Sequence, residues 1–273
     1  MSSRLRLFTL FLMCGLSIFV VPIFISGDTE TMYMIGLPAL FLLSGVLIHR
    51  NKSLRKHFHV FYAFFIASFA CSLQHIVVGG VFGSSEIMPS AVDGIVFHKL
   101  LSTLLVVISI VLLTKISGNH MASIYLKEGK LRLGLAIGLA TLVFFLVTSV
   151  QASTGLFGGK NLSFERVISW APWISAFVLS NGLREELWFR ALFLKKYESM
   201  LGAETSNFLQ AMIFSMAHLG SQYTPYLLIF LAITFFLGLA FGAVIQRTDS
   251  LLGSILFHAG TDIPAVLGYF SNI

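Results

Sequence analysis

The sequence predicts an all-α protein, a polytopic bundle of transmembrane helices with eight or nine spans and a polar cavity formed by the C-terminal helices. Two observations predict this fold class. The 273 residues are 56% hydrophobic and only 11% charged, with a mean hydropathy of +0.88, whereas soluble domains contain about 25% charged residues. The apolar residues also gather in runs of the roughly 20 residues that a helix needs to cross a bilayer.

The apolar runs follow one another with short linkers, none longer than about twenty residues, which leaves no room for a soluble domain. The seventh run is short for a span and is compatible with a segment that re-enters the bilayer. In chain order the predicted spans are 5–26, 32–49, 58–82, 95–114, 131–151, 166–194, 205–220, 224–246 and 251–270.

Most of the Lys and Arg residues fall in loops on one side of these spans. Because cytoplasmic loops are enriched in Lys and Arg, we expect a multi-pass protein of a bacterial cytoplasmic membrane with its N-terminus inside. The net charge of +6 then serves as an orientation signal, and no nucleic-acid partner is expected. The residues expected inside are Arg4, Arg6, Arg50, Lys52, Arg55, Lys56, Lys115, Lys127, Lys130, Arg132, Lys195, Lys196 and Arg247.

Ionisable residues inside predicted spans are concentrated in the C-terminal third. Such groups are costly in a bilayer and often mark function. Helix geometry places the polar groups of three spans at similar depths, roughly 15–21 Å from the loops that flank them. By contrast, Lys99 in an earlier span is expected to snorkel to an interface. The clustered residues are Glu185, Glu186, Arg190, His218, His258 and Asp262.

Two adjacent carboxylates with an arginine one turn further along the helix are typical of a general-base site. The arginine can keep one carboxylate ionised, while burial raises the pKa of the other toward the working pH. Histidines from two other helices could donate hydrogen bonds to an oxyanion or transfer a proton. This set is typical of an amide hydrolase that activates water with a glutamate. The same side chains could hold zinc, with Glu185, His218 and His258 as ligands, so a zinc cofactor stays an open alternative to a mechanism that needs no cofactor.

Three motifs in order resemble those of one protease family. The run Glu185–Arg190 matches EExxxR, Phe214–His218 matches FxxxH, and His258–Asp262 matches HxxxN/D. The chain thereby resembles the CPBP (CAAX protease and bacteriocin-processing, or Abi) intramembrane endopeptidases, which include type II CAAX prenyl endopeptidases. The resemblance implies a helical membrane protease whose cavity opens toward the cytoplasm, with residues 131–273 as catalytic core and residues 1–130 as spans of unknown role.

The resemblance also implies a role for each motif residue. Glu185 would activate water, supported and oriented by Glu186 and Arg190, and His218 would be the catalytic histidine. His258 would stabilise the oxyanion together with Asp262. Where the family has Asn in the last motif its amide can donate a hydrogen bond, whereas Asp262 donates only when protonated, so it is also compatible with orienting His258.

The implied substrate is a membrane-associated protein or peptide, and neither its sequence nor the oligomeric state can be read from the chain. Two other functions use the same residues. A proton-coupled transporter could relay protons through the intramembrane acids, although no duplicated halves are visible in the sequence. A non-catalytic immunity or binding protein could retain the same scaffold.

Overall fold

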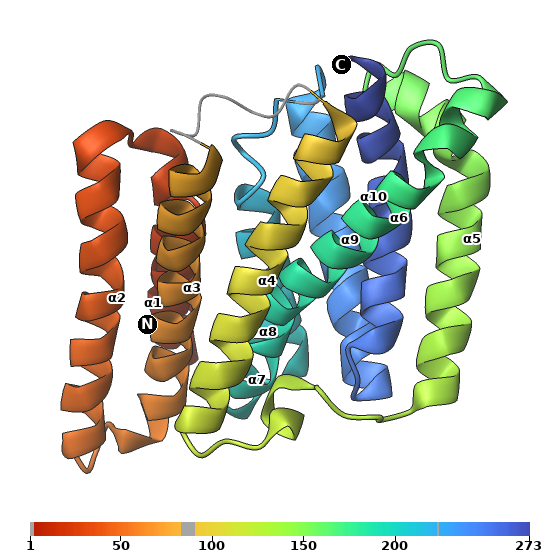
Figure 1. Ribbon diagram of the computed structural model, residues 1–273. Coiled ribbons are helices and arrows are strands. Elements are labelled where there is room, and N and C mark those ends of the chain that lie inside the picture. The colour runs from red at the N-terminus through yellow and green to blue at the C-terminus, as the bar shows by residue number, and fades with distance from the viewer. Residues whose placement is uncertain (1–2, 83–90, 223) are drawn as a thin grey trace.

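The computed structural model describes residues 3–82, 91–222 and 224–273, and these residues form helices and loops without a β-strand (Figure 1). The all-α prediction is therefore confirmed. The helices are α1 Ser3–Phe19, α2 Gly27–Arg50, α3 Phe58–Phe82, α4 Val92–Ile116, α5 Leu131–Leu156, α6 Phe164–Glu185, α7 Leu194–Leu201, α8 Ala203–Met216, α9 Leu227–Thr248 and α10 Leu252–Ser271. A π-helix, η4, spans Glu186–Ala191, and short 3₁₀ turns lie at Val21–Phe24, Arg55–His57 and Met121–Ile124.

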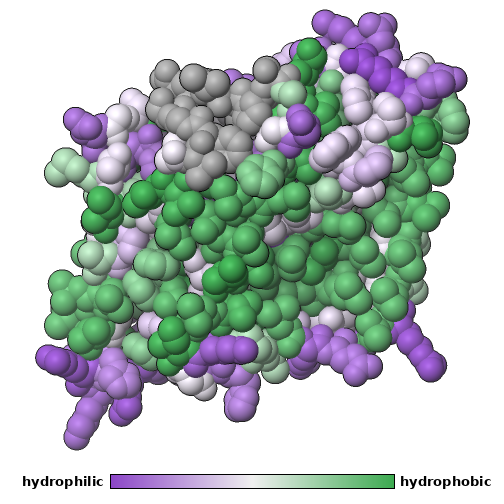
Figure 2. Space-filling view, in the orientation of Figure 1, coloured by the Kyte–Doolittle hydropathy of each residue, from purple (hydrophilic) through white to green (hydrophobic). Residues whose placement is uncertain are grey.

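The outer surface of the bundle is apolar, which identifies an integral membrane protein. Five segments are long and apolar enough to cross a bilayer: Gly27–Arg50, Arg55–Gly80, Val92–Ile116, Leu131–Leu156 and Leu227–Thr248. Large side chains on them, such as Leu228 and Val147, are 81% and 73% exposed. Figure 2 shows this apolar belt between hydrophilic groups at the two ends of the molecule. A surface of this kind is stable in lipid rather than in water.

The other predicted spans also contain helices, but these differ from the prediction in length and continuity. The apolar run 166–194 is not one helix, because α6 changes into η4 at Glu186 and a turn then separates it from α7. Helix α8 has only 14 residues. The first helix ends at Phe19, just before the turn that contains Pro22, whose ring removes a backbone donor. The predicted number of eight or nine spans stays a prediction.

Glycines bring α5 and α10 into close contact, as small residues do between membrane helices. A Cβ built on Gly138 would lie 2.8 Å from the carbonyl oxygen of Gly253, and one on Gly260 would lie 2.9 Å from Cα of Leu142. Helix α6 approaches α10 in the same way, since a Cβ on Gly182 would lie 2.9 Å from the carbonyl oxygen of Ile255. These contacts fix α10 against two neighbours.

One end of the bundle, which we call the basic face, collects the loops rich in Lys and Arg. Lys127 forms an ion pair with Asp249, and Lys195 lies 3.8 Å from the same carboxylate. The linker after α4 is thereby joined to the beginning of α7 and to the α9–α10 turn. Lys56, from the linker after α2, lines a small surface pocket together with Lys195, so it belongs to the same face.

The opposite end carries the C-terminus, and we call it the C-terminal face (Figure 1). Asn272 donates from Nδ2 to the carbonyl oxygen of Gly158 at 3.2 Å. Thr224 donates from Oγ1 to the carbonyl oxygen of Leu156 at 2.8 Å. The loop after α5 therefore meets the end of α10 here, and the loop before α9 meets the end of α5.

Candidate active site

Glu186 is the centre of a buried network that joins η4 to α10. Its Oε1 accepts hydrogen bonds from Nη1 of Arg190 at 2.9 Å and from Nδ1 of His258 at 2.8 Å. Its Oε2 accepts from the hydroxyl of Ser254 at 2.5 Å. Glu186 and Arg190 are both 0% exposed. Because both carboxylate oxygens already bind protein groups, Glu186 is placed to orient His258.

The π-helix sets the positions of these side chains. The backbone N–H of Leu192 donates to the carbonyl oxygen of Leu187, five residues earlier, at 3.2 Å. This widened turn contains the whole Glu186–Ala191 segment, and π-helical turns within helices occur frequently at functional sites. It directs the guanidinium of Arg190 over the ring of Phe214, 3.9 Å from the ring centroid, which adds a cation–π contact to the ion pair.

Glu185, the preceding residue, lies on the wall of a pocket. Its Oε1 accepts a hydrogen bond from Nη2 of Arg184 at 2.9 Å. Its Oε2 lies 3.5 Å from Nε2 of His258 and is buried without a hydrogen-bond partner among the described residues. A buried carboxylate oxygen needs a donor, and a water or substrate group in the pocket can supply it. The two adjacent glutamates thus have different surroundings.

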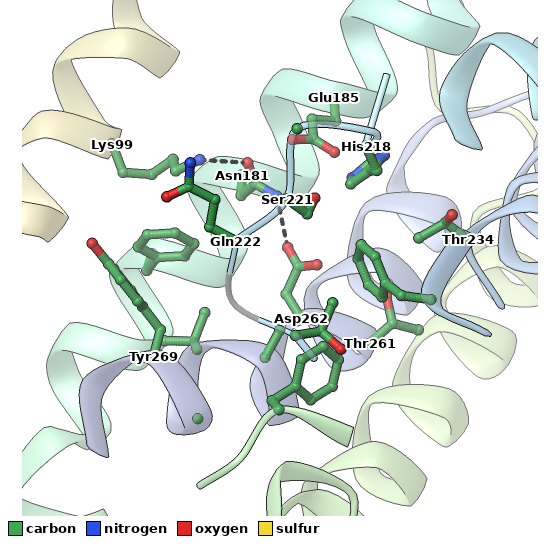
Figure 3. A pocket seen from close by; sticks show the side chains of 18 of the residues that line it. Lys99, Asn181, Glu185, His218, Ser221, Gln222, Thr234, Thr261, Asp262 and Tyr269 are labelled. Atoms are coloured by element: carbon green, nitrogen blue, oxygen red, sulfur yellow. Dashed lines mark hydrogen bonds between the residues drawn. The ribbon is translucent and has the colours of Figure 1, made fainter. Parts of the chain in front are cut away.

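His218 turns one ring nitrogen toward the backbone and lines the same pocket (Figure 3). Its Nδ1 lies 2.7 Å from the carbonyl oxygen of Phe214. Since a carbonyl only accepts hydrogen bonds, Nδ1 carries the proton and Nε2 of the neutral ring is an acceptor. The Phe214 ring lies edge-on between His218 and His258, with centroid distances of 4.7 and 5.7 Å, and Phe241 stacks on His258 at 4.7 Å.

Asp262 belongs to a second polar chain, which Figure 3 shows across the pocket. Its Oδ2 accepts a hydrogen bond from Nδ2 of Asn181 at 2.8 Å. The Asn181 Oδ1 in turn accepts from Nζ of Lys99 and from Nη2 of Arg184, both at 3.0 Å. The Oδ1 of Asp262 lies 3.7 Å from Nε2 of His258, which is too long for a hydrogen bond.

This second polar chain corrects one expectation from the sequence and adds one residue that the sequence analysis missed. Lys99 does not snorkel to an interface, because its ammonium group binds Asn181 beside the pocket and lies 4.8 Å from the ring centroid of Phe177. Asn181 was not among the predicted site residues. Its position four residues before Glu185, and hence on the same side of a helix, was the available signal.

The pocket has a volume of about 1310 Å³ and is lined by residues of α4, α6, α8, α9, α10 and the loops at the C-terminal face. Glu185, His218, His258 and Asp262 all line it, whereas Glu186 and Arg190 do not. The lining reaches Gly158 and Asn272 at the C-terminal face and includes no residue of the basic face as defined above. The expectation that the cavity opens toward the cytoplasm stays a prediction.

The zinc alternative requires Glu185, His218 and His258 to converge on one point. In the part of the chain that the structure describes, no group of three or more His, Cys, Asp or Glu side chains is arranged to hold a metal ion. His258 donates from Nδ1 to Glu186, which leaves Nε2 available as a ligand. The zinc alternative therefore stays a prediction, and we derive no step through a metal.

Comparison with known proteins shows what the segment that carries the site is similar to. Residues 167–264 match the family model described as type II CAAX prenyl endopeptidase Rce1-like. This range contains all six predicted site residues, and the resemblance drawn from the three motifs is confirmed over it. Lys99 lies outside the range. Neither a curated protein nor a solved structure matches the chain.

Proposed function

Starting from a membrane protein with a domain of this protease family, we propose that the chain is an intramembrane endopeptidase. Its substrate would be a membrane-associated protein or peptide, and Glu185 would activate the hydrolytic water. The observation that carries the proposal is the Oε2 atom of Glu185, a buried acceptor without a hydrogen-bond partner in the described structure, at the wall of a large pocket and 3.5 Å from a histidine nitrogen.

In the proposed mechanism, Glu185 is the base and Glu186 is not. Glu186 has both oxygens occupied by Arg190, His258 and Ser254, so it cannot accept a proton from water without breaking that network. Glu185 keeps one oxygen toward the pocket while Arg184 holds the other. A water that donates to this oxygen can attack a peptide carbonyl carbon bound above it.

The two histidines have complementary roles in this proposal. His218, with its proton on Nδ1, offers Nε2 as an acceptor that orients the same water. His258 is held by Glu186 through Nδ1, and its Nε2 faces the pocket. We assign the stabilisation of the oxyanion to a proton on this Nε2, which requires the imidazolium form of His258 because Nδ1 already donates to Glu186. The proton that Glu185 takes from the water then passes to the leaving amine, which leaves a new carboxyl and a new amino terminus.

The test compares the N-termini of membrane proteins in cells that express wild type, Glu185→Gln or Glu204→Gln at matched levels. Glu204 is an exposed residue of α8 and serves as the control. We expect specific new N-termini with wild type and with Glu204→Gln, and their loss with Glu185→Gln. If the same termini persist with Glu185→Gln, Glu185 is not the base. If wild type itself produces no new termini, a non-catalytic role of the scaffold becomes the better account.

A further inference from the structure

The small pocket on the basic face, which we call the lysine pocket, shares no lining residue with the pocket of the candidate active site. It has a volume of about 280 Å³. Three parts of the chain line it: the linker between α2 and α3 with the first residues of α3, the linker after α4, and α7. Figure 1 shows these segments together at one end of the bundle.

The lining of the lysine pocket is cationic. It contains the ammonium groups of Lys56, Lys195 and Lys196, and no Asp or Glu among the described residues. The carboxylate of Asp249 lies 3.8 Å from Lys195, but it also forms an ion pair with Lys127, so it does not neutralise the lining. Burial, together with the nearby ammonium group of Lys195, lowers the pKa of Lys196 to about 8. An anion in the pocket would relieve this repulsion.

Two of these lysines occupy an unfavourable place on their helix and are nevertheless held there. Lys195 and Lys196 lie in the first turn of α7, which contains no acidic residue, although the partial positive charge of a helix N-terminus disfavours cations. Nζ of Lys195 donates to the carbonyl oxygen of Ala122 at 3.3 Å, and Nζ of Lys196 donates to that of Leu192 at 2.6 Å. Because an ammonium group has three donors, both keep donors for a ligand.

A serine adds a hydrogen-bond donor to these charges. Oγ of Ser123, in the linker after α4, is buried at the pocket without a hydrogen-bond partner among the described residues. A buried hydroxyl is normally paired. An oxygen of an anion that lies between the ammonium groups could accept its hydrogen bond, and a phosphate group has several such oxygens.

The lysine pocket lies where the apolar helices end. The apolar segment Arg55–Gly80 begins beside it, with Lys56 as its second residue, and Val92–Ile116 ends three residues before Asn119 in the lining. The ends of helices that cross a bilayer lie near the polar headgroups of the lipids. Lipid phosphates are therefore concentrated at the height of the pocket.

We propose that the lysine pocket binds a phosphate group, which the headgroup of an anionic phospholipid or inorganic phosphate can supply. The proposal is independent of the proposed function, because it concerns a separate pocket and a ligand that is not cleaved.

Thermal unfolding of the purified full chain in detergent identifies the source of the phosphate. Tm is measured with dioleoylphosphatidylglycerol, with the zwitterionic dioleoylphosphatidylcholine, with sodium phosphate, and with sodium chloride of equal ionic strength. A ligand that binds only the folded protein, at about 100 times its dissociation constant, should raise Tm by at least about 5 °C. A rise with phosphatidylglycerol beyond that with phosphatidylcholine supports the lipid source, and a rise with phosphate beyond that with chloride supports the free anion.

Three variants distinguish a specific site from a diffuse attraction to a basic surface. Lys56→Gln and the control Lys52→Gln remove the same charge from the same linker, but Lys52 is exposed and does not line the pocket. We expect Lys56→Gln to weaken binding of the active phosphate source about fivefold, and Lys52→Gln to weaken it less than about twofold. Ser123→Ala, which leaves the charge unchanged, should weaken it about threefold.

The Tm of each variant without ligand serves as its own reference, so a general loss of stability does not imitate a loss of binding. Equal weakening by Lys56→Gln and Lys52→Gln would overturn the proposal, as would the absence of a rise in Tm with both phosphate sources. Neither result would bear on cleavage, which Glu185→Gln tests separately.

Discussion

Neutralising either of the two adjacent glutamates should give opposite results, although the substitutions are chemically identical. Glu186→Gln leaves the guanidinium of Arg190 without its carboxylate partner in a site that is 0% exposed. Removal of one partner from a buried ion pair destabilises a protein by about 3–5 kcal/mol. For a chain of this size each kcal/mol corresponds to about 2–4 °C, so we expect Tm in detergent to fall by roughly 6–20 °C.

Glu185→Gln should instead leave the fold intact and remove the activity. Its Oε2 has no hydrogen-bond partner among the described residues, and Arg184 retains Asn181 as an acceptor. We therefore expect Tm to remain within about 4 °C of wild type. Loss of a general base lowers the rate by about 10²–10⁴-fold, so cleavage should fall by at least about 100-fold.

Thermal unfolding and cleavage are measured on both variants in the same detergent. The double variant Glu186→Gln/Arg190→Met removes both charges of the buried pair, and we expect it to recover part of the lost stability. A lower Tm for Glu185→Gln with an unchanged Tm for Glu186→Gln would refute the assignment of the two glutamates.

Three further outcomes follow from the structure. Lys99→Met should lower cleavage about tenfold in wild type but less than twofold in an Asp262→Asn background, because Lys99 is joined to Asp262 by hydrogen bonds through Asn181. Equal effects of Lys99→Met in the two backgrounds of this double-mutant cycle would contradict the coupling. Gly138→Val should lower Tm by several degrees because its Cβ would meet the Gly253 carbonyl, whereas the control Gly155→Ala, with open space around its Cβ, should not. Cleavage by purified protein should persist after treatment with a chelator, and its loss with recovery on added zinc would favour the metal alternative.

The sequence predicted the helical class and the clustering of the motif residues, because both depend on patterns local to the chain. Apolar runs of span length predict membrane helices, and residues four apart, such as Glu186 and Arg190 or His258 and Asp262, lie along one helix side. The structure brings Glu185, Glu186 and His258 together from α6, η4 and α10.

Other features could not be predicted, because they depend on helix geometry and on contacts distant in sequence. Hydropathy does not distinguish an α-helical from a π-helical turn, so the change from α-helix to π-helix at Glu186 could not be predicted from the sequence. Lys99 and Asn181 are 82 residues apart, and the direction of the Lys99 side chain is set by how α4 packs on α6. The pocket lining also depends on loops that follow α1, α5 and α8 and on the end of α10.

The π-helical turn makes the site sensitive to the number of residues as well as to their identity. A π turn contains one residue more than an α turn, and in a regular α-helix each residue advances by about 100°. Deletion of a single residue between Glu186 and Arg190 would restore an α-helix while shifting that pair from a separation of four to three. Chains that keep both glutamates and the arginine but have one residue fewer between them would therefore present a different set of groups to α10.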